Sequence, residues 1–276
     1  MSGHAAALTS ELFEPVTNDP LAERVAAQVE ELILCGVLKE GAHLPGERDL
    51  ATKLEVSRPK LREALALLES RKLVRVVAGQ GAFIAPLSGP MMSPALIDLY
   101  TRHPAAVDDH LEFRRYQESF AAQLAAERAT AEDKDRLATL VAAMQEAPEG
   151  GDLERAASLD SEFHMAIVEA SYNRTLIHTM TALYALNRRS VFFNRTELLT
   201  SAEARTSVLR QHRDIAAAIL ARDPTGAAQR SMEHIDFIRT AMMQSLAGRD
   251  RQSLSHKRQV ARKLAVWDGP STSHQD

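Results

Sequence analysis

The sequence predicts a mainly α-helical protein in which a small helix-turn-helix domain with a β-hairpin precedes an antiparallel bundle of about six helices. Three observations lead to this prediction. Residues 19–86 hold three amphipathic segments and then an alternating one, whereas residues 108–247 show helical periodicity with short interruptions. Aromatic residues make up only 5% of the 276 residues, 45% are hydrophobic and 25% are charged. This length and composition suit two globular domains rather than a disordered or membrane-spanning chain.

The first domain is expected to begin with a helix that Asp19 caps and Pro20 starts. A second helix is predicted over residues 47–54. A third begins after its cap at Ser57 and continues through Leu68. Two short helices joined by a tight turn are typical of a helix-turn-helix.

A β-hairpin follows directly. Residues 74–77 alternate between apolar and polar types, residues 82–84 form the second run, and Gly79 and Gly81 flank the turn between them. Glycine suits this reversal because it adopts positive φ without strain. A hairpin after a helix-turn-helix is a wing, so residues 19–86 are predicted to be a winged helix-turn-helix domain.

The charge pattern is compatible with DNA binding although the net charge is −4. Between Ser57 and Arg75 the chain carries six Lys or Arg residues against two Glu. A local basic stripe can meet phosphates because the field at one face matters more than the total charge. A solvated helix face is the alternative interpretation of the same stripe.

The run LPGERDLATKLEVSRPKLREALALLESRKLVRVVAGQGAFI closely resembles the winged helix of the GntR family of bacterial transcription factors. The family pattern is LPSER(E/D)LA, then VSRxxLREAL, then a GxG wing tip; Gly46 departs from it where Ser or Thr is usual. The resemblance implies that the third helix enters the major groove, where an arginine fork matches guanine, and that the wing tip approaches the minor groove. A surface ion pair of Arg62 with Glu63 or Glu69 is the alternative for that residue. The implied DNA-binding residues are Arg48, Ser57, Arg58, Lys60, Arg62, Gly79 and Gln80.

Prolines and a glycine interrupt the periodicity between residues 85 and 106, which predicts a linker. Helices are then expected over 109–129, 131–147, 152–171, 173–193, 201–222 and 224–246, an antiparallel bundle whose interior would hold a ligand. The predicted parts of the chain are an extension over 1–18, the winged helix over 19–86, the linker over 87–107, the bundle over 108–247 and a basic tail over 248–276.

Three helices of the bundle carry candidate metal ligands. Asp160 and His164 stand four residues apart and share one side of a helix, and His212 and His234 lie on the apolar faces of two later helices. Three imidazoles and a carboxylate suit Zn²⁺, Ni²⁺ or Mn²⁺. By spacing alone, three unrelated core or surface histidines explain the pattern better than a ligand set.

The second half of the chain is also similar to the FCD effector domain that accompanies this winged helix in the FadR subfamily. The segments that carry the similarity are LEFRRYQESFAAQLAAERAT, LDSEFHMAIVEAS, QHRDIAAAI and MEHIDFI. The resemblance implies that Asp160, His164, His212 and His234 hold a divalent metal ion. Within this group, the first two segments look like those of regulators of pyruvate or lactate metabolism. This resemblance implies a small 2-oxo or 2-hydroxy acid as effector.

An effector carboxylate would need a cation or a metal ion. Arg114 matches the arginine of the family's first bundle helix and could bind a carboxylate through two hydrogen bonds, and Asn187, Arg188 and Arg189 are further candidates. A buried ion pair of Arg114 with Glu118, one helical turn away, is the alternative.

Two functions remain from the sequence. The first is a homodimeric, ligand-responsive transcriptional regulator, expected to be a repressor, that binds a short inverted repeat in double-stranded DNA. The second is a metal-dependent hydrolase or lyase using the Asp/His₃ site. The winged helix favours the regulator, which we do not expect to be an enzyme. Cys35 as the one cysteine excludes an internal disulfide, and with no secretory signal or apolar span evident the sequence predicts a cytoplasmic protein without a membrane partner.

Overall fold

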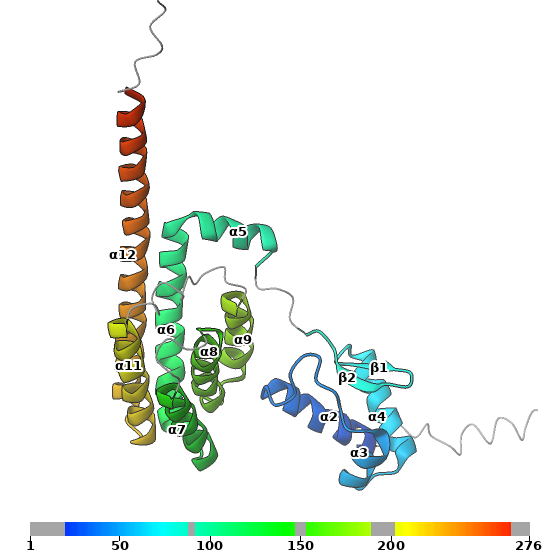
Figure 1. The fold of residues 1–276 in the computed structure, drawn as a ribbon. Helices are drawn as coiled ribbons and strands as arrows, with labels where there is room; N and C mark the ends of the chain where they lie inside the picture. Colours follow the sequence, from blue (N-terminus) through cyan, green and yellow to red (C-terminus); the bar gives the residue numbers. More distant parts are fainter. Residues whose placement is uncertain (1–19, 88–91, 147–152, 189–201, 266–276) are drawn as a thin grey trace, which may run out of the picture. The chain divides into compact units, whose positions relative to one another are not determined.

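The computed structural model describes residues 20–87, 92–146, 153–188 and 202–265. The chain forms two compact units that divide between Gly89 and Pro90. Within these residues, the first unit holds three helices and a two-stranded sheet, and the second is helical (Figure 1). None of the helices in these residues is long and apolar enough to cross a membrane.

The first unit is the predicted winged helix. Helix α2 (Pro20–Leu34) precedes α3 (Glu47–Lys53) and α4 (Arg58–Ser70), and strands β1 (Val74–Val77) and β2 (Gly81–Ile84) follow. The strands pair antiparallel, with Val74 opposite Ile84 and Val77 opposite Gly81. The apolar faces of all five elements meet in one core, which includes Val25, Ala51, Leu61, Leu68 and Ile84.

Helix α4 begins as its sequence predicts. The side chain of Ser57 accepts a hydrogen bond from the backbone N–H of Lys60, and Pro59 occupies the first turn, where a missing N–H has no cost. Leu61, Ala64, Leu65 and Leu68 form its buried face. The opposite face therefore remains available to a partner.

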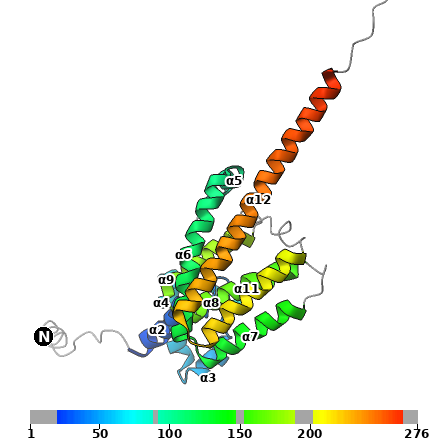
Figure 2. The ribbon, with the colours of Figure 1, turned by 90° about the vertical axis from the view of Figure 1, so that its left-hand side faces the viewer.

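The second unit is a bundle around α6 (Pro104–Arg128) and α12 (Pro224–Ala265), which pack side by side (Figure 2). The other helices are α5 (Pro94–Arg102), α7 (Ala131–Glu146), α8 (Leu153–Ala170), α9 (Arg174–Arg188) and α11 (Ala202–Leu220). Ion pairs join the two long helices: Arg239 donates to Asp108 at 2.5 and 2.6 Å, and Arg115 donates to Asp236 at 2.8 Å. The main core lies among α6, α7, α8, α9, α11 and the first turn of α12, which contributes Ala227.

Two expectations about regular structure were wrong in part. The boundary between the two units falls within the predicted linker, between Gly89 and Pro90, but the later part of that segment is helical: Ser93 caps α5 at Pro94, and α6 begins at Pro104. Proline breaks a helix in its interior but is well accommodated in the first turn. The last helix does not end near residue 246 but continues to Ala265, through most of the basic segment.

Candidate metal centre and DNA-binding face

Three histidines from three helices meet inside the bundle. His164 comes from α8, His212 from α11 and His234 from α12, and one nitrogen of each lies within 4.8 Å of the others. The ring centroids are 4.7–5.2 Å apart. All three side chains are at least 97% buried. The helices bring them together because each histidine belongs to the inward face of its helix.

Asp160 completes the group from the turn of α8 that precedes His164. Its carboxylate oxygens lie 3.6 Å from Nε2 of His164 and 3.5 Å from Nε2 of His212. These distances are too long for good hydrogen bonds. They are close to the separation of about 3.0–3.4 Å expected of two ligands that each lie about 2.1 Å from a shared ion.

The buried donor atoms fit a metal ion. Nε2 of His164 is buried and has no hydrogen-bond partner among the described residues. A buried polar atom without a partner costs free energy, which a coordinated cation would remove. Imidazole nitrogens with one carboxylate are the donor set of Zn²⁺, Ni²⁺ and Mn²⁺ sites. The four side chains therefore fit the metal that the sequence predicts.

The protonation state of His234 also suits a ligand. Burial, together with the neighbouring His212 and His164, holds the pKa of His234 well below its ordinary value. The ring is therefore neutral near pH 7, as a metal ligand must be. Nδ1 of His234 lies 2.9 Å from Oε1 of Gln211, so a proton on Nδ1 leaves Nε2 as the ligand atom.

Behind the histidines lies a buried carboxylate, Glu118 of α6. Its Oε2 is 2.9 Å from Nδ1 of His164, and its Oε1 accepts hydrogen bonds from Tyr184 at 2.7 Å and from Arg114 at 2.8 Å. Burial alone would raise the pKa of Glu118, but Arg114 and His164 outweigh it and hold the pKa well below the usual range. Glu118 is thus ionised and favours a proton on Nδ1 of His164, which directs Nε2 towards the metal position.

Of the candidate effector-binding side chains, the structure describes that of Arg114. Arg114 is 1% exposed and forms the buried pair with Glu118, with Nη2 2.6 Å from Oε1. Although burial lowers the pKa of Arg114, Glu118 and the neighbouring groups raise it above its ordinary value, so the guanidinium is charged. Asn187 and Arg188 end α9, but their side chains lie outside the described residues, as does all of Arg189.

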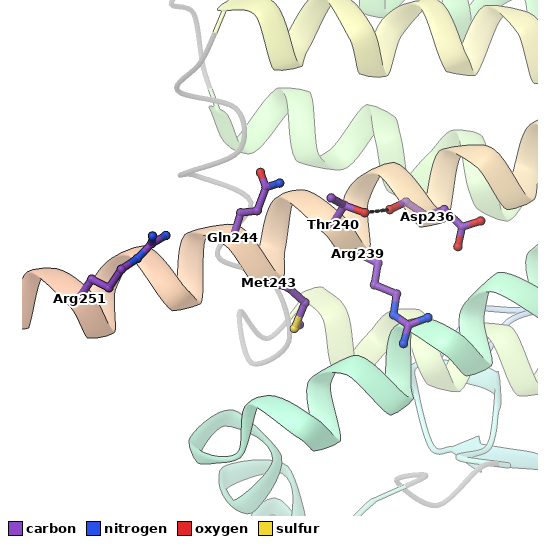
Figure 3. Close-up of a pocket in the computed structure, with 6 residues that line it drawn as sticks. All are labelled: Asp236, Arg239, Thr240, Met243, Gln244 and Arg251. Atoms are coloured by element: carbon purple, nitrogen blue, oxygen red, sulfur yellow. Dashed lines mark hydrogen bonds between the residues drawn. The ribbon is translucent and has the colours of Figure 1, made fainter.

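A hollow on α12 is separate from this site. It measures about 580 Å³ and is lined by Asp236, Arg239, Thr240, Met243, Gln244 and Arg251 (Figure 3). None of the four candidate metal ligands lines it. Arg239 points from α12 towards α6, where Asp108 accepts its hydrogen bonds.

The predicted DNA-binding side chains gather on α3 and α4. Arg58 and Arg62 are 59% and 63% exposed at their side chains, and both are near Glu47 of α3, at 3.8 and 2.8 Å. The expected alternative for Arg62, a pair with Glu63 or Glu69, was wrong: Lys60 pairs with Glu63, and Glu69 accepts from the backbone of Val76. Because exposed ion pairs contribute only about 0–1 kcal/mol, a phosphate or base can replace Glu47.

The remaining predicted contacts lie at exposed positions. Arg48 follows Glu47 on α3, and Ser57 is exposed as the cap of α4. At the wing tip, Gly79 and Gly81 have φ of +75° and +99°, as the predicted turn requires, and Gln80 between them is exposed. Helix and wing thus present polar groups that a duplex could reach.

Comparison with known proteins gives the family. The model of the gntR family of bacterial regulatory proteins matches residues 21–84, and that of the FCD domain matches residues 109–237. The Glc operon transcriptional activator of Escherichia coli K12 is 34% identical over 223 residues, which are 80% of this chain and 88% of that protein. The chain belongs to the GntR family. Its members named here are transcriptional regulators, so this protein is a DNA-binding regulator and not an enzyme.

Two further known proteins cover a similar share of this chain. A regulator of Escherichia coli K12 named for the L-lactate dehydrogenase operon is 34% identical over 229 residues, 82% of this chain and 86% of its own. A solved structure of a Streptococcus agalactiae GntR protein is 29% identical and covers 80% of this chain and 99% of that one, with a TM-score of 0.49. In this chain the two family models together cover the winged helix and most of the bundle.

Sequence reasoning missed several residues that surround the GntR protein's two sites. Gln211 and Tyr184 approach the histidine cluster, and Glu47 approaches the arginines predicted to contact DNA. Glu118 was considered only as a partner of Arg114. The spacing of Arg114 and Glu118 did predict their pair, but no local pattern indicates that Glu118 reaches His164 on another helix.

Proposed function

We propose that this GntR regulator senses a small carboxylic acid at a metal ion held by Asp160, His164, His212 and His234. The observation that carries the proposal is the convergence of three buried histidines and a carboxylate in the bundle of a chain that also carries a winged helix. A regulator of this kind needs a ligand site whose occupancy biases two conformations with different affinities for DNA. The histidine cluster is the best candidate for that site.

The metal would be Zn²⁺, Ni²⁺ or Mn²⁺. Four protein ligands leave positions open on an ion that accepts five or six, and a carboxylate could occupy them. The ion would supply positive charge and fixed geometry to that carboxylate. The protein's own contribution is to keep His234 neutral by burial and to orient His164 and His234 through Glu118 and Gln211.

The effector is proposed to be a small 2-hydroxy or 2-oxo acid. One relative is named for an L-lactate dehydrogenase operon, which makes L-lactate a natural first probe. Arg114, with Asn187 and Arg188 as further candidates, is proposed to assist the metal in holding the acid. In the structure Arg114 already binds Glu118, so the acid would share or replace that carboxylate.

We further propose that the protein acts as a homodimer. Three aromatic side chains on α6 form an exposed row: Phe113 is 43% exposed, Tyr116 56% and Phe120 44%. Their spacing of three and four residues puts them on one face of the helix. Contiguous exposed aromatic surface is typical of interaction sites, and a two-fold dimer would present two winged helices to an inverted repeat. We propose this row as part of the dimer interface.

The proposed place of action is the cytoplasm, and the proposed sense of regulation is repression. DNA contact is assigned to Arg48, Ser57, Arg58, Lys60, Arg62, Gly79 and Gln80. Since one relative is named an activator, the sense is tested by a promoter fusion in strains with and without the gene. Higher expression without the gene is expected of a repressor, and lower expression would make it an activator.

One experiment tests the proposed function as a whole. A duplex selected by the purified protein from random DNA is titrated with metal-loaded and chelator-treated protein, with and without L-lactate, pyruvate and related acids. We expect at least one acid to change DNA affinity only when metal is present. Thermal shift with the same acids supplies an independent readout, because a ligand that binds the folded state stabilises it. Equal DNA affinity in every condition would contradict metal-dependent sensing.

A further inference from the structure

Residues 41–44, just before α3, add a third, strand-like segment to the wing. His43 pairs with Phe83 of β2 as an isolated antiparallel bridge. Three backbone hydrogen bonds flank this bridge: Gly41 N–H to Ile84 O at 3.0 Å, Ile84 N–H to Ala42 O at 2.9 Å, and Leu44 N–H to Ala82 O at 2.8 Å. Strand β2 therefore lies between β1 and residues 41–44, which lead directly into α3.

The side chain of His43 reaches from this edge to the wing tip. Its Nε2 lies 2.9 Å from the backbone carbonyl oxygen of Gln80. A carbonyl can only accept, so Nε2 carries the proton and donates to it. The ring also packs against Phe83, with centroids 4.7 Å apart and planes tilted by 55°. One side chain thus contacts both the tip and the second strand of the wing.

Gly81 provides the space for this ring. A Cβ atom at residue 81 would lie 2.7 Å from Nε2 of His43, closer than real contacts allow. At Gly79 a Cβ would meet nothing within 4 Å, although φ is also positive there. Gly79 is therefore needed only for its backbone conformation, whereas Gly81 is needed for its conformation and for the close approach of His43.

From this geometry we propose that His43 is a positioning residue for DNA binding: it fixes the wing tip relative to the helix-turn-helix. The inference rests on the proposed contact of the wing with DNA. His43 is four residues before Glu47, the first residue of α3, and its hydrogen bond ends on the residue whose side chain is to meet the minor groove. Pre-organising that residue lowers the entropy lost when DNA binds.

The test compares full-length variants on a duplex that the wild-type protein selects from a random pool. His43→Ala is expected to weaken binding about 2- to 10-fold, the range of one net hydrogen bond. His43→Gln keeps an N–H donor and should restore most of the affinity, whereas His43→Phe keeps ring packing without a donor and should bind like the alanine variant. His178→Ala, an exposed histidine of the effector domain, is the control. Restoration by Phe and not by Gln would overturn the hydrogen-bond role.

A double-mutant cycle shows whether His43 acts through the tip. Gln80→Ala removes the side chain proposed to meet DNA but keeps the carbonyl that accepts from His43. If His43 positions Gln80, the Gln80→Ala loss should be smaller in the His43→Ala background. Hydrogen exchange of residues 74–84 should also be faster in His43→Ala. A loss with Gln80→Ala but none with His43→Ala would overturn this inference alone; no loss with either would also overturn the wing–DNA contact.

Discussion

Nδ1 of His164 and Oε2 of Glu118 lie 2.9 Å apart, both buried, on helices that meet at the centre of the bundle. The contact orients a candidate metal ligand through a carboxylate that a guanidinium keeps ionised. Metal-binding histidines commonly have such a partner on their second nitrogen. The pair therefore connects Arg114, which faces Glu118, to the proposed metal position.

Glu118→Gln is expected to lower metal affinity about 10- to 100-fold, as removal of such a partner usually does. The amide keeps the size of the side chain but loses the charge that favours a proton on Nδ1 of His164. A competition titration with a chromophoric Zn²⁺ chelator measures the change. Glu127→Gln, at an exposed position on the same helix, is the matched control. Unchanged affinity in Glu118→Gln would show that the contact has no part in metal binding.

His164→Ala, His212→Ala and His234→Ala are each expected to reduce the metal content of the purified protein and to abolish its response to the effector. Each removes one donor from a site in which the three nitrogens lie within 4.8 Å. Metal analysis measures the content, with His178→Ala as the exposed histidine control. Because metal binding and folding are coupled, unfolding temperature is recorded with and without metal. Full metal occupancy in all three variants would exclude this site.

Arg58→Ala and Arg62→Ala are expected to weaken binding to the selected duplex by about 1–3 kcal/mol, while Glu47→Gln should tighten binding to random DNA. Glu47 faces both arginines and places a negative charge on the DNA-binding face. Its removal should therefore lower the ratio of specific to non-specific affinity. Anisotropy titrations on both duplexes at two salt concentrations measure this. Wild-type affinity in both arginine variants would exclude α4 from the groove.

Replacing the row Phe113, Tyr116 and Phe120 with serine is expected to weaken the dimer at least about 10-fold, because aromatic side chains commonly dominate interface energy. All three are exposed in the single chain, so its own core should be unaffected. Sedimentation at several concentrations measures the dimer, and circular dichroism checks the fold. Leu254→Ser, which replaces an exposed apolar residue on the extension of α12, is the control. An unchanged dimer would place the interface elsewhere.

Local sequence rules account for most of the fold. The Ser57 cap, the Gly79–Gly81 turn and the apolar spacing of α4 are each set by neighbours in sequence, and the predicted winged helix and bundle are confirmed. The same rules predicted an irregular linker that is too long, because a proline that breaks a helix interior also starts a helix well, as Pro94 and Pro104 do. The sequence pattern also placed the end of the last helix near residue 246, whereas α12 continues to Ala265, because a charged helix can continue without an apolar face.

The site residues show the same difference between contacts set by sequence spacing and contacts set by packing between helices. The spacing of Asp160 and His164 predicts that they share a side of α8, and the spacing of Arg114 and Glu118 predicts their pair. That His212 and His234 join Asp160 depends on packing among three helices, which spacing does not encode; the family resemblance supplied it. The contact of Glu47 with Arg62 crosses from α3 to α4 and had no signal in the pattern.

The last prediction is that metal and acid bind cooperatively. A carboxylate held by a buried arginine that already pairs with Glu118 gains little, whereas a divalent ion nearby adds attraction and fixes geometry. Linkage requires that the acid tighten metal binding by the same factor as metal tightens acid binding, typically about 5- to 150-fold. Calorimetric titration of an acid that changes DNA affinity, into metal-free and metal-loaded protein, measures both factors. Equal acid affinities would make the metal structural.

The role of Arg114 as an anchor for the acid needs its own variant. Arg114→Ala would leave Glu118 buried without its cation, so Arg114→Met combined with Glu118→Gln tests the anchor with charge balance kept. Normal acid binding in that double variant would move the anchor from Arg114 towards Asn187 and Arg188.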